Sequence, residues 1–245
     1  YVAFAGASAS GPGGAVQVVS DNWNDAPPTT LHVIAHGDSI TLGGGVLQPY
    51  ISRLVALIKA NRGESAQGYR FGINGATWNY AWSEAGYPYS LIQDVPVRVV
   101  QALSASVPNW VILFAGTNGD AIFHDTAERQ YADLQAEIAV ILLAGVPANH
   151  IIVNTMLPRG GGSEAYRMAY NAAIVADPGR IGYLVARLDL DAHIGVAGAY
   201  GNPVYFQADQ VHPTDAAHQL IAQIDYWVMF PKGHHDYPDT SGQKR

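Results

Sequence analysis

Two short polar segments of this 245-residue chain place a serine, an aspartate and a histidine where they could perform nucleophilic chemistry. Ser39 lies in IAHGDSITLGGG (residues 34–45), where an apolar run gives way to glycines. Serine is a weak nucleophile unless a histidine takes its proton. The segment QADQVHPT (207–214) offers His212 as that base, and Asp209, three residues earlier, can fix the tautomer of its ring. The sequence therefore predicts a catalytic triad of Ser39, Asp209 and His212.

Acyl transfer by such a triad also needs hydrogen-bond donors for the oxyanion that forms, and loss of one donor typically costs about 3 kcal/mol. The backbone amide of Ser39 is one candidate. Gly75 in NGAT (74–77) is a second, because the lack of a side chain lets a ligand approach its backbone amide closely. Asn118 in GTNG (116–119) offers a side-chain amide. The three donors define a predicted oxyanion hole.

Other readings of the glycine-rich turn fit the sequence less well. A phosphate-binding P-loop needs a Gly-Lys-Ser/Thr sequence, and none of the lysines (Lys59, Lys232 and Lys244) stands in that context. The turn also lacks the GxGxxG spacing of a dinucleotide loop. The GxSxG elbow fails because Thr41 occupies its last position. Glycines 43–45 are then expected to be a slack connection between Ser39 and a following helix.

Composition limits the possible partners and cofactors. The formal net charge is −7 and only 13% of residues are charged, below the roughly 25% of ordinary soluble domains, which argues against nucleic acid as a partner. No cysteine is present, so disulfides and thiol catalysis are excluded. No apolar run approaches the roughly 20 residues that span a bilayer. No metal ion or cofactor is predicted, and the oligomeric state stays open.

The elements that must position these residues alternate between apolar strands and amphipathic helices. The predicted strands span residues 31–36, 69–73, 110–116, 150–156 and 183–190. The predicted helices span residues 46–63, 91–106 (with Pro96 in its first turn), 126–145, 163–176 and 214–230, the last with Thr214 as its cap. This alternation indicates a central, mostly parallel five-stranded sheet that is covered by helices on both faces. In such sheets the sites form at the carboxyl ends of the strands, which is where the polar segments fall.

Three regions are expected along the chain. Residues 1–30 are rich in Gly, Ala and Ser and form an N-terminal extension, either a linker or an edge strand. Residues 31–230 form the catalytic domain, and residues 231–245 form a polar tail. The chain begins at Tyr1 without Met, so a removed signal and a secreted or extracellular location are compatible with it.

Taken in order, four short blocks resemble the SGNH or GDSL-type hydrolase family of serine esterases and lipases: GDSI (37–40), NGAT (74–77), GTN (116–118) and DQVHP (209–213). Each block alone is a weak signal, whereas the ordered set on the expected loops is specific. The resemblance covers most of residues 31–230. It implies a three-layer α/β/α fold of flavodoxin-like type and metal-free hydrolysis of esters or thioesters. It also implies roles for Ser39, Gly75, Asn118 and His212, with Asp209 as the acidic partner. The third block departs from the family pattern because Gly119 stands where an aspartate usually follows the asparagine.

The substrate is indicated less directly, by aromatic residues close to the predicted site. Trp78, Tyr80 and Trp82 follow Gly75, and Tyr205 shortly precedes Asp209. Aromatic faces suit stacking on sugar rings, the lining of an acyl pocket, or simple packing of a loop. The sequence thus favours an acetyl or short-chain esterase that acts on a small-molecule ester or an acetylated carbohydrate.

Several alternatives to that function stay open. An acyltransferase, a lipase or a thioesterase could use the same site residues, and a catalytically silent carbohydrate-binding domain could retain the fold. Three other polar residues are expected to have no catalytic role. Asp38 should brace the turn beside Ser39, while His36 and His218 should be structural or exposed.

Overall fold

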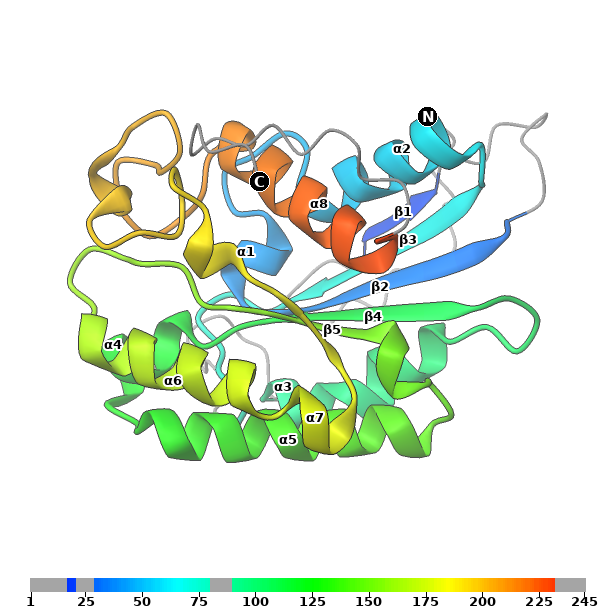
Figure 1. Cartoon of the computed structure of the whole chain (residues 1–245), viewed down its shortest axis with the longest axis horizontal. Coiled ribbons are helices and arrows are strands. Elements are labelled where there is room, and N and C mark those ends of the chain that lie inside the picture. The colour runs from blue at the N-terminus through cyan, green and yellow to red at the C-terminus, as the bar shows by residue number, and fades with distance from the viewer. Residues whose placement is uncertain (1–16, 21–28, 80–89, 232–245) are drawn as a thin grey trace, which may run out of the picture.

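The computed structural model describes residues 17–20, 29–79 and 90–231 of the chain. Its centre is a six-stranded sheet of order β1-β3-β2-β4-β5-β6 (Figure 1). The strands are β1 (Gln17–Ser20), β2 (Leu31–Gly37), β3 (Ala66–Gly72), β4 (Asn109–Phe114), β5 (Ile151–Asn154) and β6 (Leu184–Ala186). Strands β3, β2, β4, β5 and β6 pair in parallel, which confirms the predicted five-stranded parallel sheet.

The sixth strand comes from the N-terminal extension. Strand β1 pairs antiparallel with β3, and Gln17 lies opposite Arg70 while Ser20 lies opposite Gln67. The sequence predicts either a linker or an edge strand for residues 1–30, and these four residues form an edge strand. An antiparallel edge strand on an otherwise parallel sheet is common in large mixed sheets.

Helices cover both faces of the sheet, as the alternating sequence pattern predicts (Figure 1). They are α1 (Ser39–Leu42), α2 (Tyr50–Arg62), α3 (Leu91–Asp94), α4 (Thr117–Phe123), α5 (Ala127–Leu143), α6 (Glu164–Ala176), α7 (Pro178–Ile181) and α8 (Asp215–Met229). Helices α2 and α8 lie on one face, whereas α3, α5 and α6 lie on the other. Within the described ranges, no helix has both the length and the apolar character needed to cross a membrane.

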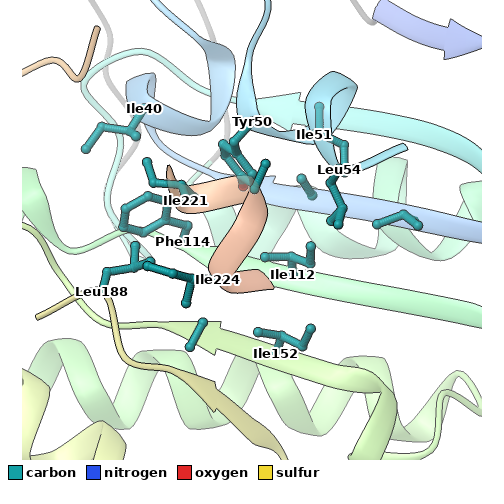
Figure 2. Packing of buried hydrophobic residues seen from close by; sticks show 14 of the residues in the cluster. Ile40, Tyr50, Ile51, Leu54, Ile112, Phe114, Ile152, Leu188, Ile221 and Ile224 are labelled. Carbon is teal, nitrogen blue, oxygen red and sulfur yellow. The ribbon is translucent and has the colours of Figure 1, made fainter. Parts of the chain in front are cut away.

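Successive residues of the central strands face opposite layers, and this alternation builds two cores. On β4, Ile112 and Phe114 pack toward α2 and α8, whereas Val111 and Leu113 pack toward α5 and α6. Figure 2 shows the first core, in which Tyr50 and Leu54 of α2 and Ile221 of α8 surround the sheet residues. Strands that are buried on both faces have continuous apolar sequences, which explains the apolar runs of these strands.

Several predicted element boundaries are wrong, and proline accounts for two of them. Helix α2 begins at Tyr50 instead of residue 46, because the extended Pro49 precedes its first turn. The helix expected over 91–106 is divided into α3, a π-helical turn (Val95–Val99) and a 3₁₀ turn (Val100–Ala102). Pro96 falls inside this π turn, since it has no N–H to donate to an α-helical ladder.

Two further expectations about element ends differ from the structure. Strand β6 ends at Ala186, because the chain continues into a 3₁₀ turn (Leu188–Leu190) instead of reaching residue 190 as a strand. Thr214 is the N-cap residue of α8 by position, as predicted, but its side chain does not cap the helix, because its hydroxyl donates to the Val204 carbonyl oxygen at 2.6 Å.

A buried cluster of ionisable groups joins β2 to the helices beneath it. The ring of His36 lies between two carboxylates, with Nδ1 at 2.7 Å from Glu137 Oε1 and Nε2 at 3.0 Å from Asp94 Oδ2. The Arg98 guanidinium donates to both Asp94 oxygens at 2.7 Å. Both ring nitrogens face acceptors, so the ring is held in its doubly protonated form. His36 therefore has the structural role expected for it.

These contacts shift the pKa values of the cluster in opposite directions. Burial alone lowers the pKa of His36, but the charge of Glu137 and the hydrogen bonds with Asp94 and Glu137 raise it to about 9. Burial alone raises the pKa of Asp94, and its hydrogen bonds with His36 and Arg98 bring it down to about 2. Elsewhere, burial and the charge of Arg53 lower the pKa of His218 to about 4.

The protein should lose stability as the pH rises from 6.5 to 9. In this window the unfolded chain has released the His36 proton, whose ordinary pKa is 6.5, while the folded protein still binds it. The stabilisation is complete below pH 6.5 and is lost as the pH rises through about 9. His218 acts in the opposite sense, but only between about pH 4 and 6.5. The measurement is the urea midpoint of unfolding at half-unit pH intervals.

The matched variant for this prediction is His36→Gln, which keeps polar atoms but has no titrating ring. Its midpoint should be lower at pH 6.5 and should change little between pH 6.5 and 9. A wild-type midpoint that stays constant or rises across that window would contradict the predicted linkage.

Candidate active site

The turn after β2 places Ser39 at the first residue of α1. Asp38 precedes this short helix and accepts a hydrogen bond from the Ile40 amide at 2.9 Å, so it caps the helix. Burial raises the pKa of Asp38 to about 6, although the charges of His212 and Arg159 oppose that shift. The expectation that Asp38 braces the turn is confirmed. The Ser39 side chain is thereby held at the carboxyl end of a central strand.

The structure brings Ser39, His212 and Asp209 together. His212 Nε2 lies 2.9 Å from Ser39 Oγ, and His212 Nδ1 lies 2.6 Å from Asp209 Oδ2. A carboxylate only accepts hydrogen bonds, so Nδ1 carries the proton and Nε2 is free to accept the Ser39 hydroxyl proton. This is the geometry and the tautomer that general-base activation of a serine requires.

Local hydrogen bonds hold Asp209 in place although its side chain is 47% exposed. Its Oδ1 atom accepts the Val211 amide at 2.9 Å and the His212 amide at 3.0 Å. Partial burial raises the pKa of Asp209, but the hydrogen bonds from His212 and Val211 outweigh it and lower the pKa below its ordinary value. Asp209 is therefore ionised at neutral pH and can stabilise a positively charged imidazole ring.

Two of the predicted oxyanion donors, Asn118 and Gly75, lie on segments that contact each other. Asn118, in the first turn of α4, is 4% exposed, and its Nδ2 atom donates to the Ala76 carbonyl oxygen at 3.0 Å. This bond ties Asn118 to the segment of Gly75, which adopts a left-handed φ of 71°. Within the described part of the chain, the Ser39 and Gly75 amides donate no protein hydrogen bond. Both amides and the second Nδ2 proton of Asn118 are thus available donors.

The departure at Gly119 has a steric explanation. A Cβ atom at this position would lie 2.3 Å from the Tyr166 hydroxyl oxygen, so a larger residue would displace that ring. The acidic residue is shifted to Asp120, whose Oδ2 atom accepts the Ser163 amide at 2.8 Å. The local chain accommodates the change while Asn118 stays bonded to Ala76.

Glycines 43–45, called the glycine turn below, are not the slack connection that was expected. Gly43 and Gly45 adopt left-handed φ angles of 77° and 78°. The Gly43 and Gly44 amides both donate to the Ser39 carbonyl oxygen, at 3.0 and 3.2 Å. A Cβ atom at Gly45 would lie 2.7 Å from Gln207 Oε1. The turn is therefore tight and packed, since only glycine fits these conformations easily.

The structure does not support the predicted substrate contacts as it supports the contacts of the triad. Trp78 as a substrate contact is wrong, because its side chain is fully buried and its Nε1 atom donates to Tyr170 Oη at 2.7 Å. Tyr80 and Trp82 lie outside the described residues. Tyr205 is half-buried, and its ring stacks on His193 with a centroid distance of 5.0 Å.

Two polar residues near the site escaped the sequence analysis. Arg159, in the loop after β5, donates from Nη1 to the Thr117 carbonyl oxygen at 2.9 Å, directly before Asn118. Gln207 donates from Nε2 to the Gly44 carbonyl oxygen at 2.8 Å. Neither residue belongs to the four short blocks that resemble the family, so only the folded chain reveals these contacts. Among the described residues, no group of three or more His, Asp and Glu side chains is placed to hold a metal ion.

Comparison with known proteins identifies the class of this chain. Residues 35–220, more than half of the chain, match the model of the GDSL-like lipase/acylhydrolase family. The chain therefore belongs to this family, and it is a hydrolase of carboxylic esters. The resemblance drawn from the four sequence blocks is confirmed. No protein of curated function matches the chain by sequence.

Solved structures share the fold at low sequence identity. A lipolytic protein of the G-D-S-L family from Veillonella parvula DSM 2008 has a TM-score of 0.60 at 19% identity, over 83% of this chain and all of the other. The psychrotrophic esterase EstA from Pseudoalteromonas sp., in a structure inhibited by monoethylphosphonate, has a TM-score of 0.59 at 15% identity, over 80% and 94%. AlinE4, an SGNH-hydrolase family esterase, has a TM-score of 0.54 at 18% identity, over 82% and 96%. These similarities confirm the α/β/α fold.

The packing of the glycine turn predicts unequal effects of two alanine substitutions. Gly45→Ala should lower the free energy of unfolding by about 1–2 kcal/mol, because Ala is strained at a left-handed φ. Gly44→Ala is the matched control, since its φ lies outside that region and its new Cβ atom would lie no closer than 3.7 Å to His212 Cδ2. Urea unfolding of both variants provides the measurement. Equal losses of stability would show that the turn is not constrained in this way.

Proposed function

We propose that this chain is a serine esterase that works through an acyl-enzyme formed on Ser39. The observation that carries the proposal is the unbroken hydrogen-bonded contact from Ser39 Oγ through His212 to Asp209. Family membership supports the reaction class, since the family comprises lipases and acylhydrolases.

In the proposed reaction, His212 Nε2 removes the Ser39 hydroxyl proton while Oγ attacks the ester carbonyl carbon. The negative charge on the carbonyl oxygen is stabilised by the amides of Ser39 and Gly75 and by Asn118 Nδ2. His212 then protonates the departing alcohol, which leaves Ser39 acylated. A water molecule activated by the same ring releases the acid and restores Ser39. Throughout, the ionised Asp209 stabilises the charged ring.

The substrate proposed is a small ester with a short acyl group, and an acetylated carbohydrate is the preferred candidate. Support for a polar alcohol comes from the segment that holds His212, where Asp209 and Gln210 are exposed and Tyr205 is half-buried. The buried Trp78 no longer supports a sugar-stacking surface. The carbohydrate part of this proposal therefore rests on Tyr205 and on the sequence after residue 79.

The proposed organisation of the chain follows from the same site. Residues 31–230 form the catalytic domain, which supplies every residue of the proposed triad and oxyanion hole. Residues 1–30 form an extension that contributes the edge strand β1, and residues 231–245 form a polar tail.

Replacing Ser39 by alanine should abolish turnover of p-nitrophenyl acetate, with kcat/KM lower by about 10⁴-fold or more, because no other group can form the acyl-enzyme. Ser106→Ala, at an exposed serine, is the matched control and should behave as wild type. A second readout is stoichiometric labelling by an ethyl phosphonate ester, followed by intact-mass measurement. Wild type should gain one ethylphosphonyl group and Ser39→Ala none.

Two results would contradict the proposed mechanism. One is equal turnover by wild type and Ser39→Ala. The other is wild-type protein that neither hydrolyses the ester nor accepts the phosphonate, which would favour a catalytically silent binding domain.

The acyl preference can be measured separately from the mechanism. We expect kcat/KM for p-nitrophenyl acetate to exceed that for the octanoate by at least about tenfold, since each unaccommodated methylene group costs binding energy. Release of acetate from O-acetylated xylan oligosaccharides, against deacetylated controls, tests the carbohydrate alcohol. A preference for octanoate would instead favour a lipase or thioesterase that uses the same residues.

A further inference from the structure

The loop that holds His212 lies at the protein surface, and its position relative to Ser39 needs an explanation. This loop, residues 205–214, is called the base loop. The side chain of His212 is 25% exposed and that of Asp209 is 47% exposed, so neither side chain is enclosed in the core. The bonds between Asp209 and His212 lie within the loop and would move with it. They hold the two residues together without setting the distance to Ser39.

The side chain of Gln207 connects the base loop to the glycine turn. Its Nε2 atom donates to the Gly44 carbonyl oxygen at 2.8 Å and to the Pro213 carbonyl oxygen at 3.1 Å. Carbonyl oxygens only accept, so the amide nitrogen must face both of them and each N–H proton has its own acceptor. One half-buried side chain thus bridges the residue after His212 and the turn after Ser39.

The backbone of Gln207 adds two contacts within the base loop. Its amide donates to the His212 carbonyl oxygen at 2.8 Å, and its own carbonyl oxygen accepts the Gln210 amide at 2.9 Å. Gln207 is therefore bonded to residues on both sides of His212, through the Gln210 amide before it and the Pro213 carbonyl group after it. A shift of Gln207 would shift the base itself.

On the other side of the bridge, the glycine turn is fixed to the nucleophile. The Gly43 and Gly44 amides donate to the Ser39 carbonyl oxygen, and the absent side chain of Gly45 leaves room for the Gln207 amide. The chain of contacts runs from Ser39 through Gly44 and Gln207 to His212. It is a second connection between nucleophile and base, separate from the bond that the reaction itself uses.

We infer that Gln207 is a positioning residue that sets the distance between His212 Nε2 and Ser39 Oγ by tethering the base loop to the glycine turn. It touches no reacting atom, and its role rests on the proposed function of Ser39 and His212. A misplacement of about 1 Å between such groups can lower a rate by about a hundredfold. Loss of the tether should therefore reduce kcat more than KM.

Two substitutions remove the tether in different ways. Gln207→Ala deletes the side chain, whereas Gln207→Glu keeps its shape but points a carboxylate at two carbonyl oxygens. Both should lower kcat for p-nitrophenyl acetate by about ten- to a hundredfold with KM within about twofold. The rate of Ser39 phosphonylation should fall in parallel. Gln219→Ala is the matched control, because this half-buried glutamine also loses a side-chain hydrogen bond, with Arg53, but lies outside the site.

A spectroscopic readout separates positioning from simple loss of the fold. The proton between His212 Nδ1 and Asp209 should give a far-downfield NMR signal, and it lies within the base loop. In both Gln207 variants this signal should persist while kcat falls, and Gln219→Ala should keep wild-type kcat. Unchanged kcat in the Gln207 variants would overturn the inference. So would loss of the downfield signal, or an equal loss of kcat in Gln219→Ala.

The Ser39→Ala variant distinguishes failure of this inference from failure of the proposed function. If Ser39→Ala is inactive and the Gln207 variants are fully active, only the positioning role fails. If Ser39→Ala keeps wild-type turnover, the proposed function fails and the inference fails with it.

Discussion

The hydrogen bond between Ser39 and His212 joins residues that lie 173 positions apart, and much of the fold serves to make it possible. Ser39 begins α1 just after the end of β2 at Gly37, and His212 lies in the loop before α8, which begins at Asp215. Helix α8 packs on α2, which follows Ser39, on the same face of the sheet. The Tyr50 amide at the start of α2 donates to His218 Nδ1 at 3.1 Å, and Arg53 pairs with Asp215 at 2.5 Å. These contacts dock the two helix N-termini against each other.

On the opposite face of β2, buried ion pairs add to helix packing in holding the strand in place. His36 stands three residues before Ser39 and is enclosed by Asp94 and Glu137, with Arg98 behind them. Removing charges from water is costly unless each finds a partner, so this arrangement tolerates little displacement of any member. The end of β2 is thereby held from both layers, by α2 and α8 above and by the ion cluster below.

The features that the sequence predicts correctly are those that depend on local pattern and short motifs. Apolar periodicity predicted the parallel strands and the covering helices, and DQVHP predicted that Asp209 and His212 lie within one turn. It failed where distant backbone atoms decide the outcome. Trp78 looked like a binding residue because its neighbours are aromatic, yet Tyr170, distant in sequence, accepts its Nε1 proton in the core. The contacts of Gln207 and His36 likewise join segments whose approach only the completed sheet defines.

Two aspartates lie close to Ser39 in space, and their environments assign them different roles. Asp38 is adjacent in sequence but fully buried, and burial raises its pKa to about 6. Its Oδ1 atom is committed to the Ile40 amide, so it serves the turn. Asp209 is distant in sequence and half-exposed, and its hydrogen bonds lower its pKa. Only Asp209 is both ionised at neutral pH and in contact with Nδ1 of His212, so the acid of the triad is selected by hydrogen bonding instead of by proximity to the nucleophile along the chain.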